Sequence, residues 1–181
     1  MPVSEIAILS YIQSVLTSAY ALKKLVIIPS DPIGAYERKG QRDMLRDYYN
    51  PRRFFDIVFC LSPHEQGIRF QYGMHIIGVT DSVFQNALRL IKPNAIRCYG
   101  DYQLNWVYAN RPDPSVPIIV SIHARGTDER IQKADYVFCV TQTCATDISK
   151  FLPHHRIFVY ADRVNRQIFY PNPPPPRGCF H

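Results

Sequence analysis

The sequence lacks the short signatures of the common nucleotide and metal sites. It contains neither the G-x-x-x-x-G-K-[ST] pattern of a P-loop nor the G-x-G-x-x-G pattern of a dinucleotide-binding turn. It has no C-x-x-C pair, and Cys139 with Cys144 lacks the second pair or the neighbouring histidine that would complete a tetrahedral metal site. We therefore expect no resident metal and no tightly held cofactor.

A long uninterrupted apolar segment is also missing. The opening stretch "SEIAILSYIQSVLTSAYAL" has no basic region before it and is broken by polar side chains, which argues against a signal peptide and against a membrane-spanning helix. We predict an amphipathic helix within residues 1–22 that docks on the domain; the alternative is a helix that lies on a membrane. Its apolar face is expected to consist of Ile6, Leu9, Ile12, Val15, Leu16 and Ala19.

Composition is that of an ordinary globular domain. The chain has 181 residues, of which 46% are hydrophobic and 20% charged, so one domain with a sizeable core is expected. The formal charge of +6 predicts an anionic partner without choosing among phosphate, nucleotide and acidic membrane. Five cysteines cannot all pair with one another, and three lie in or beside apolar runs, which favours a reducing, cytoplasmic location.

Short β-rich runs alternate with helix-like segments along most of the chain. The runs cover residues 25–30, 55–62, 75–80, 95–100, 117–123, 135–141 and 156–161, and helix-like segments cover residues 36–49, 81–91 and 143–152. Several runs are nearly continuous in Val, Ile and Phe, as a parallel sheet covered on both faces requires. The predicted fold class is α/β, a Rossmann-like, doubly wound and mostly parallel sheet. We assign this domain to residues 23–171 and expect the proline-rich residues 172–181 to be a linker or tail.

In such a sheet, ligands bind at the carboxyl ends of the strands. After the first run comes "PSDPIGAYERKG", where Ile33, Gly34 and Ala35 open a helix whose free N–H groups could hold an anion or sugar hydroxyls. The alternative is an ordinary connection between a strand and a helix.

Two further candidates follow later strands. In "YGDYQLNWVYANR", the aromatic and acidic side chains of Tyr99, Asp101 and Tyr102 suit sugar recognition, whereas Trp106 is better explained by packing into the core. His123 ends the apolar run "VPIIVSIH" and is followed at once by polar residues that include Arg125. The histidine is therefore expected at an edge, in a structural or a ligand-binding role.

A cluster of basic residues lies between residues 23 and 53. The spacing of Arg38, Arg42 and Arg46 would place them on one stripe of a single helix, with Lys39 beside them. A solvated helix face and contact with an anionic membrane are the two interpretations kept, the second because a lipid-linked acceptor requires docking at an interface. No motif for specific nucleic-acid recognition is present.

The order of several segments resembles the amino-terminal half of a GT-B glycosyltransferase, close to the retaining family 4. These segments are "LVIIPSDPIGAYE", "LIKPNAIRCYG", "VPIIVSIHARG", "KADYVFCVTQTCATDI" and "RIFVYADRVNRQIFYP", over roughly residues 24–171. The resemblance implies that His123 lies by the transferred sugar, that the loop of Gly34 approaches donor phosphate and acceptor, and that a second domain binds the nucleotide sugar, which is a co-substrate.

The sequence departs from that family in three places. The turn written "NGVD" in the family is replaced by "ADRVNRQIFYP", and only about a dozen residues separate His123 from "ADYVF". The family's second domain, with its basic pair and its paired glutamates, has no counterpart in this sequence.

Two hypotheses follow. In the first, the chain is the acceptor-side domain of a sugar transferase, with His123 as the catalytic residue, and it needs a donor domain lost by truncation or supplied by another chain. In the second, it is a non-catalytic Rossmann-like module whose basic face binds an anionic ligand, a membrane surface or a protein. The isolated chain is expected to transfer no sugar under either hypothesis.

Overall fold

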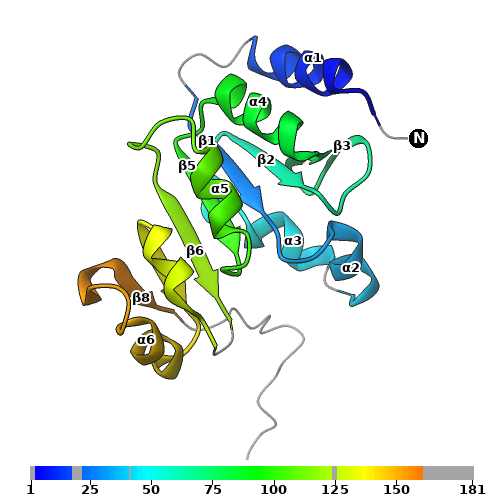
Figure 1. Ribbon diagram of the computed structural model, residues 1–181. Helices are drawn as coiled ribbons and strands as arrows, with labels where there is room; N and C mark the ends of the chain where they lie inside the picture. Colours follow the sequence, from blue (N-terminus) through cyan, green and yellow to red (C-terminus); the bar gives the residue numbers. More distant parts are fainter. Residues whose placement is uncertain (1–2, 18–21, 41, 124–125, 161–181) are drawn as a thin grey trace, which may run out of the picture.

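The computed structural model describes residues 3–17, 22–40, 42–123 and 126–160, which form an eight-stranded sheet flanked by helices (Figure 1). The strand order is β3-β4-β2-β1-β5-β6-β7-β8. The strands are β1 (Lys24–Ile28), β2 (Ile57–Ser62), β3 (Ile68–Gln71), β4 (Met74–Gly78), β5 (Ala95–Tyr99), β6 (Ile118–Ile122), β7 (Tyr136–Cys139) and β8 (Ile157–Val159). The α-helices are α1 (Glu5–Leu16), α2 (Ile33–Arg38), α3 (Arg42–Tyr48), α4 (Asp81–Ile91), α5 (Leu104–Asn110) and α6 (Gln142–Ile148). Short 3-10 turns are η1 (Pro51–Arg53), η2 (Glu129–Lys133) and η3 (His154–Arg156).

The sheet confirms the predicted fold class. All neighbouring strands run parallel except β3, which pairs with β4 in the antiparallel sense. The strands expected in the interior, β1, β5, β6 and β7, each have a neighbour on both sides, and most of their side chains are buried. Strand β3 was not foreseen, because its side chains are mostly half-buried or exposed and its sequence shows no apolar run.

Helices cover the two faces of the sheet unequally. Helices α1, α4, α5 and α6 contribute to one core, in which Ile12, Phe84 and Ile148 are buried. Helices α2 and α3 pack on the opposite face, where Ile33 and Leu45 join the side chains of β1 and β2. In Figure 1, α1 and α4 lie on one side of the central strands and α2 and α3 on the other.

Helix α1 packs along α4, largely with the expected face. Ile12 is buried, and Val15 and Leu16 pack against the core as predicted. The prediction is wrong at Ile6, which is 78% exposed, and it missed Ile8, which is buried. Two polar contacts hold the helix: Asn86 Nδ2 donates to Glu5 Oε1 at 2.8 Å, and the Tyr11 hydroxyl lies 2.8 Å from His75 Nδ1. Among the described residues, no helix is both long enough and apolar enough to span a membrane.

The single helix predicted over residues 36–49 is wrong. Helix α2 ends at Arg38 and α3 begins at Arg42, with Gly40 between them at a φ of +72°. A left-handed residue ends a helix, and glycine adopts that conformation without steric cost. Arg38 and Arg42 therefore do not share one helical stripe. The side chain of Arg46, Ala19 and residues 172–181 lie outside the described part of the structure.

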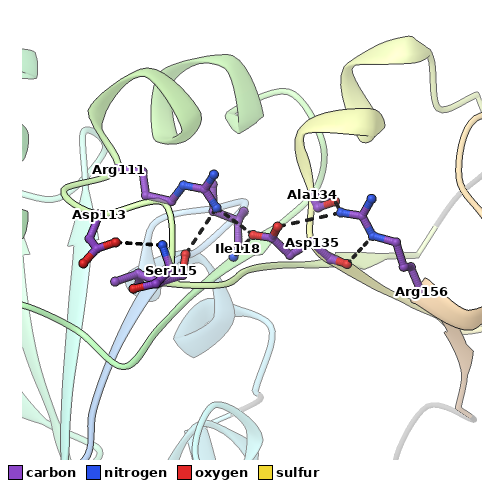
Figure 2. A network of polar contacts seen from close by, with 8 residues as sticks. Arg111, Asp113, Ser115, Ile118, Ala134, Asp135 and Arg156 are labelled. Atoms are coloured by element: carbon purple, nitrogen blue, oxygen red, sulfur yellow. Dashed lines mark hydrogen bonds and ion pairs between the residues drawn. The ribbon is translucent and has the colours of Figure 1, made fainter.

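A polar network fixes the amino ends of β6, β7 and β8 (Figure 2). The carboxylate of Asp135 accepts hydrogen bonds from Arg111 Nη1 and from the backbone N–H of Ile118, each at 2.8 Å. Arg156 donates to the carbonyl oxygens of Ala134 at 2.6 Å and Asp135 at 2.7 Å. The carboxylate of Asp135 thus pairs with two arginines and accepts a hydrogen bond from the buried N–H of Ile118. The network therefore stabilises the fold by leaving these polar groups paired.

Candidate functional site

A pocket of about 390 Å³ lies at the carboxyl end of the sheet. From β1 the chain moves outward to β2 on one side, and after α4 it returns to β5 on the other, so β1 and β5 flank the point where the strand order reverses. Doubly wound sheets bind their ligands there, because the connections diverge and leave a crevice. The lining residues are Ser30, Asp31, Tyr36, Lys39, Tyr48, Tyr99, Gly100, Asp101, Ser121, Ile122, His123, Gly126 and Thr127.

His123 stands on the rim of this pocket, at the residue directly after β6. Its side chain is exposed, as expected for an edge position, although the preceding Ile122 is buried. The Tyr48 hydroxyl lies 3.4 Å from His123 Nε2. The imidazole is thus oriented by a neighbouring hydroxyl at a solvent-accessible wall of the pocket.

The predicted glycine loop is only partly brought to the pocket. Ile33 is fully buried in the core, and its backbone N–H donates to Glu65 Oε1 at 2.5 Å, so an internal carboxylate already uses this amide. Gly34 and Ala35 follow in the first turn of α2, and neither they nor Ile33 line the pocket. The same segment instead contributes Asp31 and Tyr36.

Of the residues predicted after β5, Tyr99 and Asp101 line the pocket and Tyr102 does not. Tyr99 is 3% exposed, and its hydroxyl has no hydrogen-bond partner among the described residues. Its ring packs against Tyr48 and Tyr49 with centroid distances of 5.4 and 4.9 Å. The carboxylate of Asp101 lies 4.0 Å from Arg130 Nη2.

Tyr102 does not line the pocket, but it stabilises the pocket wall by a hydrogen bond to Ser30, which does. Its hydroxyl donates to the carbonyl oxygen of Ser30 at 2.5 Å, tying the connection after β5 to the connection after β1. Burial, followed by the nearby charge of Asp31, raises the pKa of Tyr102 to about 12, so the phenol stays protonated and keeps donating. Gly100 makes room for this ring: its φ is +101°, and a Cβ there would lie 2.7 Å from Tyr102 Cε1.

Several pocket residues were missed by sequence reasoning. Ser30 and Asp31 directly follow β1, so the rule that ligands bind at carboxyl ends could have found them. Tyr36 and Tyr48 come from α2 and α3, and their positions depend on the break between those helices. The Tyr36 hydroxyl lies 2.8 Å from Ser30 Oγ.

The remaining candidates fall elsewhere. Trp106 packs in the core, where its ring stacks on Phe84 at a centroid distance of 3.6 Å. Lys39 lines the pocket and lies 3.9 Å from Asp31, whereas Arg38 and Arg42 do not line it. Arg125 lies outside the described residues.

The pocket suits a neutral, hydroxyl-rich ligand. Hydroxyl groups, an imidazole and two carboxylates can exchange hydrogen bonds with sugar hydroxyls, and the tyrosine rings offer faces to sugar C–H groups. Within the described part of the chain, no three His, Cys, Asp or Glu side chains come together in a group that could hold a metal ion. The described lining residues can position a ligand and exchange hydrogen bonds with it.

The fold and this pocket define a Rossmann-like α/β domain with its site at the switch point of the sheet. Among solved structures, the chain is similar to one described as "lipopolysaccharide outer core galactosyltransferase WaaB apo form", with a TM-score of 0.53 and 14% sequence identity. The match covers 78% of this chain and 46% of that chain, so this chain spans about half the length of that enzyme. No model of a known protein family matches the sequence, and no curated protein is significantly similar to it in sequence. The structural match confirms the fold predicted from the sequence, a single Rossmann-like domain similar in fold to about half of that enzyme.

Proposed function

We propose that the chain is the acceptor-side half of a glycosyltransferase, which transfers a sugar from a nucleotide-sugar donor to an acceptor. The observation that carries this proposal is the pocket at the switch point, rimmed by an exposed His123, in a domain similar to half of a two-domain galactosyltransferase. A donor-binding domain, on the same or another polypeptide, is the partner that this role requires.

The chemistry divides between the two halves. Sugar transfer needs the acceptor held against the reacting carbon and the charge of the diphosphate leaving group stabilised. The hydroxyl-rich pocket would hold the acceptor, and the His123 imidazole would hydrogen-bond the transferred sugar at the rim. Stabilising the leaving group falls to the donor domain, so this chain alone is proposed to be inactive.

A cytoplasmic location agrees with the thiols of the described residues. Cys60, Cys98, Cys139 and Cys144 are buried and free. Burial raises the pKa of Cys98 to about 12 and that of Cys139 to about 11, so both stay protonated and pack as small apolar groups. Cysteines kept in this form are typical of a reducing compartment.

Saturation-transfer NMR on the isolated chain tests the proposal. With a panel of neutral mono- and disaccharides, we expect saturation of sugar C–H protons that stack on the tyrosine rings of the pocket. His123→Ala should weaken this signal, whereas His154→Ala, which changes an exposed histidine in η3 at the opposite end of the sheet, should leave it unchanged. The assignment would be contradicted if no sugar of the panel showed a saturation-transfer signal, or if His123→Ala and His154→Ala gave equal signals.

The alternative is a non-catalytic module that binds an anionic ligand through basic residues. The pocket does not favour it, because Asp31 and Asp101 face the same space as Lys39. A basic surface exists at the other end of the sheet.

A further inference from the structure

The two ends of the sheet differ in charge. The described connections that enter the amino ends of the strands carry basic residues: Lys23, Arg52, Arg53, Lys92, Arg111 and Arg156, with Lys133 closing η2. The acidic residues there are Asp56, Asp113 and Asp135, and Asp135 is already paired with Arg111 and Arg156. The described connections that leave the carboxyl ends carry Asp31, Glu65, Asp101 and Asp128 and, among their described residues, no lysine or arginine.

Exposed aromatic rings lie beside several of the basic residues at the amino end. Phe54 is 61% exposed and Phe70 is 64% exposed. The ammonium of Lys23 lies 4.5 Å from the centroid of the Phe54 ring. Arg53 and Phe70 line one pocket of about 630 Å³, so the turn before β2 and the edge strand β3 form a continuous surface. We call Lys23, Arg52, Arg53, Phe54 and Phe70 the basic–aromatic patch.

The two arginines of this patch have an unusual backbone conformation. Arg52 and Arg53 have φ values of 58° and 51°, two consecutive non-glycine residues in the left-handed region. That conformation is unfavourable for residues with a Cβ and persists only where neighbours impose it. Here Asn50 imposes it: its side-chain amide donates to the carbonyl oxygen of Phe55 at 2.7 Å, and its side-chain oxygen accepts from the N–H of Phe55 at 3.0 Å. As a result both arginines and Phe54 point into solvent.

We propose that the basic–aromatic patch docks the domain on an anionic lipid surface. Basic side chains next to exposed aromatic rings are the composition of interfacial anchors, because the cations attract anionic headgroups while the rings enter the boundary between headgroups and acyl chains. The proposal goes beyond the sugar-transferase assignment and does not depend on it. It also moves the membrane contact from Arg38, Lys39, Arg42 and Arg46 to residues at the amino ends of the strands, and it turns the pocket at the carboxyl ends away from the lipid.

Vesicle sedimentation tests this docking directly. The full chain is mixed with vesicles of phosphatidylcholine and phosphatidylglycerol at equal amounts, or of phosphatidylcholine alone, in 0.1 M salt. We expect binding to the mixed vesicles only, and its loss at 0.5 M salt, where charges are screened over a few ångströms. The double change Arg52→Asn with Arg53→Asn should weaken binding about 25-fold, since each basic residue near such a surface contributes about fivefold. Asparagine is chosen because it tolerates the left-handed conformation.

Matched variants separate this surface from the rest of the molecule. The change Arg38→Gln with Arg42→Gln removes the same charge from α2 and α3 and should leave binding unchanged. Phe54→Ser, which keeps every charge, should weaken binding about tenfold through loss of apolar contact. Circular dichroism melting checks that each variant folds, and Lys23→Gln, expected to cost about fivefold, replaces the double variant should that one unfold.

Four outcomes would overturn the proposal. Equal binding to both vesicle types would show that charge plays no part, and absence of binding to the mixed vesicles would remove the site. An equal loss in the Arg38→Gln, Arg42→Gln variant would return the contact to the helices. If a double-stranded DNA fragment displaces the chain from vesicles while Phe54→Ser binds normally, the patch is a nucleic-acid surface.

Discussion

The carboxyl and amino ends of this sheet are built from the same strands, yet they are specialised in opposite ways. At the carboxyl end, the connections surround an open pocket with an exposed histidine and hydroxyl groups. At the amino end, arginines and one carboxylate bind backbone groups and tie three strands together (Figure 2). The polar network that ties the strands together and the candidate pocket thus lie at opposite ends of the sheet.

The largest effect is expected at the amino end, from Asp135→Ala. This change leaves two arginines without their carboxylate and the buried N–H of Ile118 without an acceptor. A buried amide and a partly buried charge left unpaired together cost about 3 kcal/mol in the free energy of unfolding. Urea denaturation measures it, with Asp113→Ala as a control at an exposed carboxylate nearby. A cost below about 1 kcal/mol would show that the network does not hold the strands.

Gly100→Ala should show how far the pocket wall contributes to stability. The new Cβ would sit at a φ of +101° and 2.7 Å from the Tyr102 ring, so backbone strain and a clash add up to about 2 kcal/mol. Gly126→Ala is the matched control, because its φ is +96° but no atom lies within 4 Å of the new Cβ. It should cost only the backbone term, about 1 kcal/mol. Equal costs in the two variants would mean that Tyr102 moves aside freely.

His75, in β4, predicts a pH dependence of stability. His75 packs among Phe59, Phe70 and Tyr11, and burial lowers its pKa below the ordinary value of 6.5. The folded state therefore favours the neutral ring, so stability is fully present above about pH 6.5 and is lost as the pH falls through the folded-state pKa. Thermal melts at pH 7 and pH 5 should show this loss in the wild type and a smaller loss in His75→Asn. If His75→Asn lost as much stability between pH 7 and pH 5 as the wild type, the pH dependence would come from other groups.

His123→Ala should have the smallest effect on stability. The side chain is exposed and its 3.4 Å contact with Tyr48 is long, so the free energy of unfolding should change by no more than about 0.5 kcal/mol. Sugar transfer by the chain joined to its donor domain should nevertheless fall strongly. Unfolding curves and transfer rates measured on the same variant decide the matter: a large loss of stability with an unchanged rate would make His123 a structural residue.

The interior strands of this fold could be predicted from the sequence because buried parallel strands are recognisable as runs of apolar residues. Strands β1, β5, β6 and β7 are nearly continuous in apolar residues, since both of their faces are covered. Strand β3 has no such apolar run, because its side chains are half-buried or exposed to solvent. The face of α1 was misjudged at Ile6, whose exposure depends on how the helix lies on α4.

Residues of the candidate site could be predicted only where they lie at or directly after the end of a strand. His123, Tyr99 and Asp101 were found because they come at or just after the ends of strands. Tyr36 and Tyr48 reach the pocket only because Gly40 divides one helical pattern into two helices, and a propensity argument does not set the angle between them. The same break places Arg38 and Arg42 on two helices instead of one stripe.

Calorimetric titration of the isolated chain with common nucleoside diphosphates tests most directly whether this chain is one half of a sugar transferase. We expect no binding tighter than high micromolar, because the donor domain would build the nucleotide site and the described pocket joins Asp31 and Asp101 to a single lysine, Lys39. A dissociation constant in the low micromolar range or below would contradict it, because the pocket at the switch point would then be a complete nucleotide site.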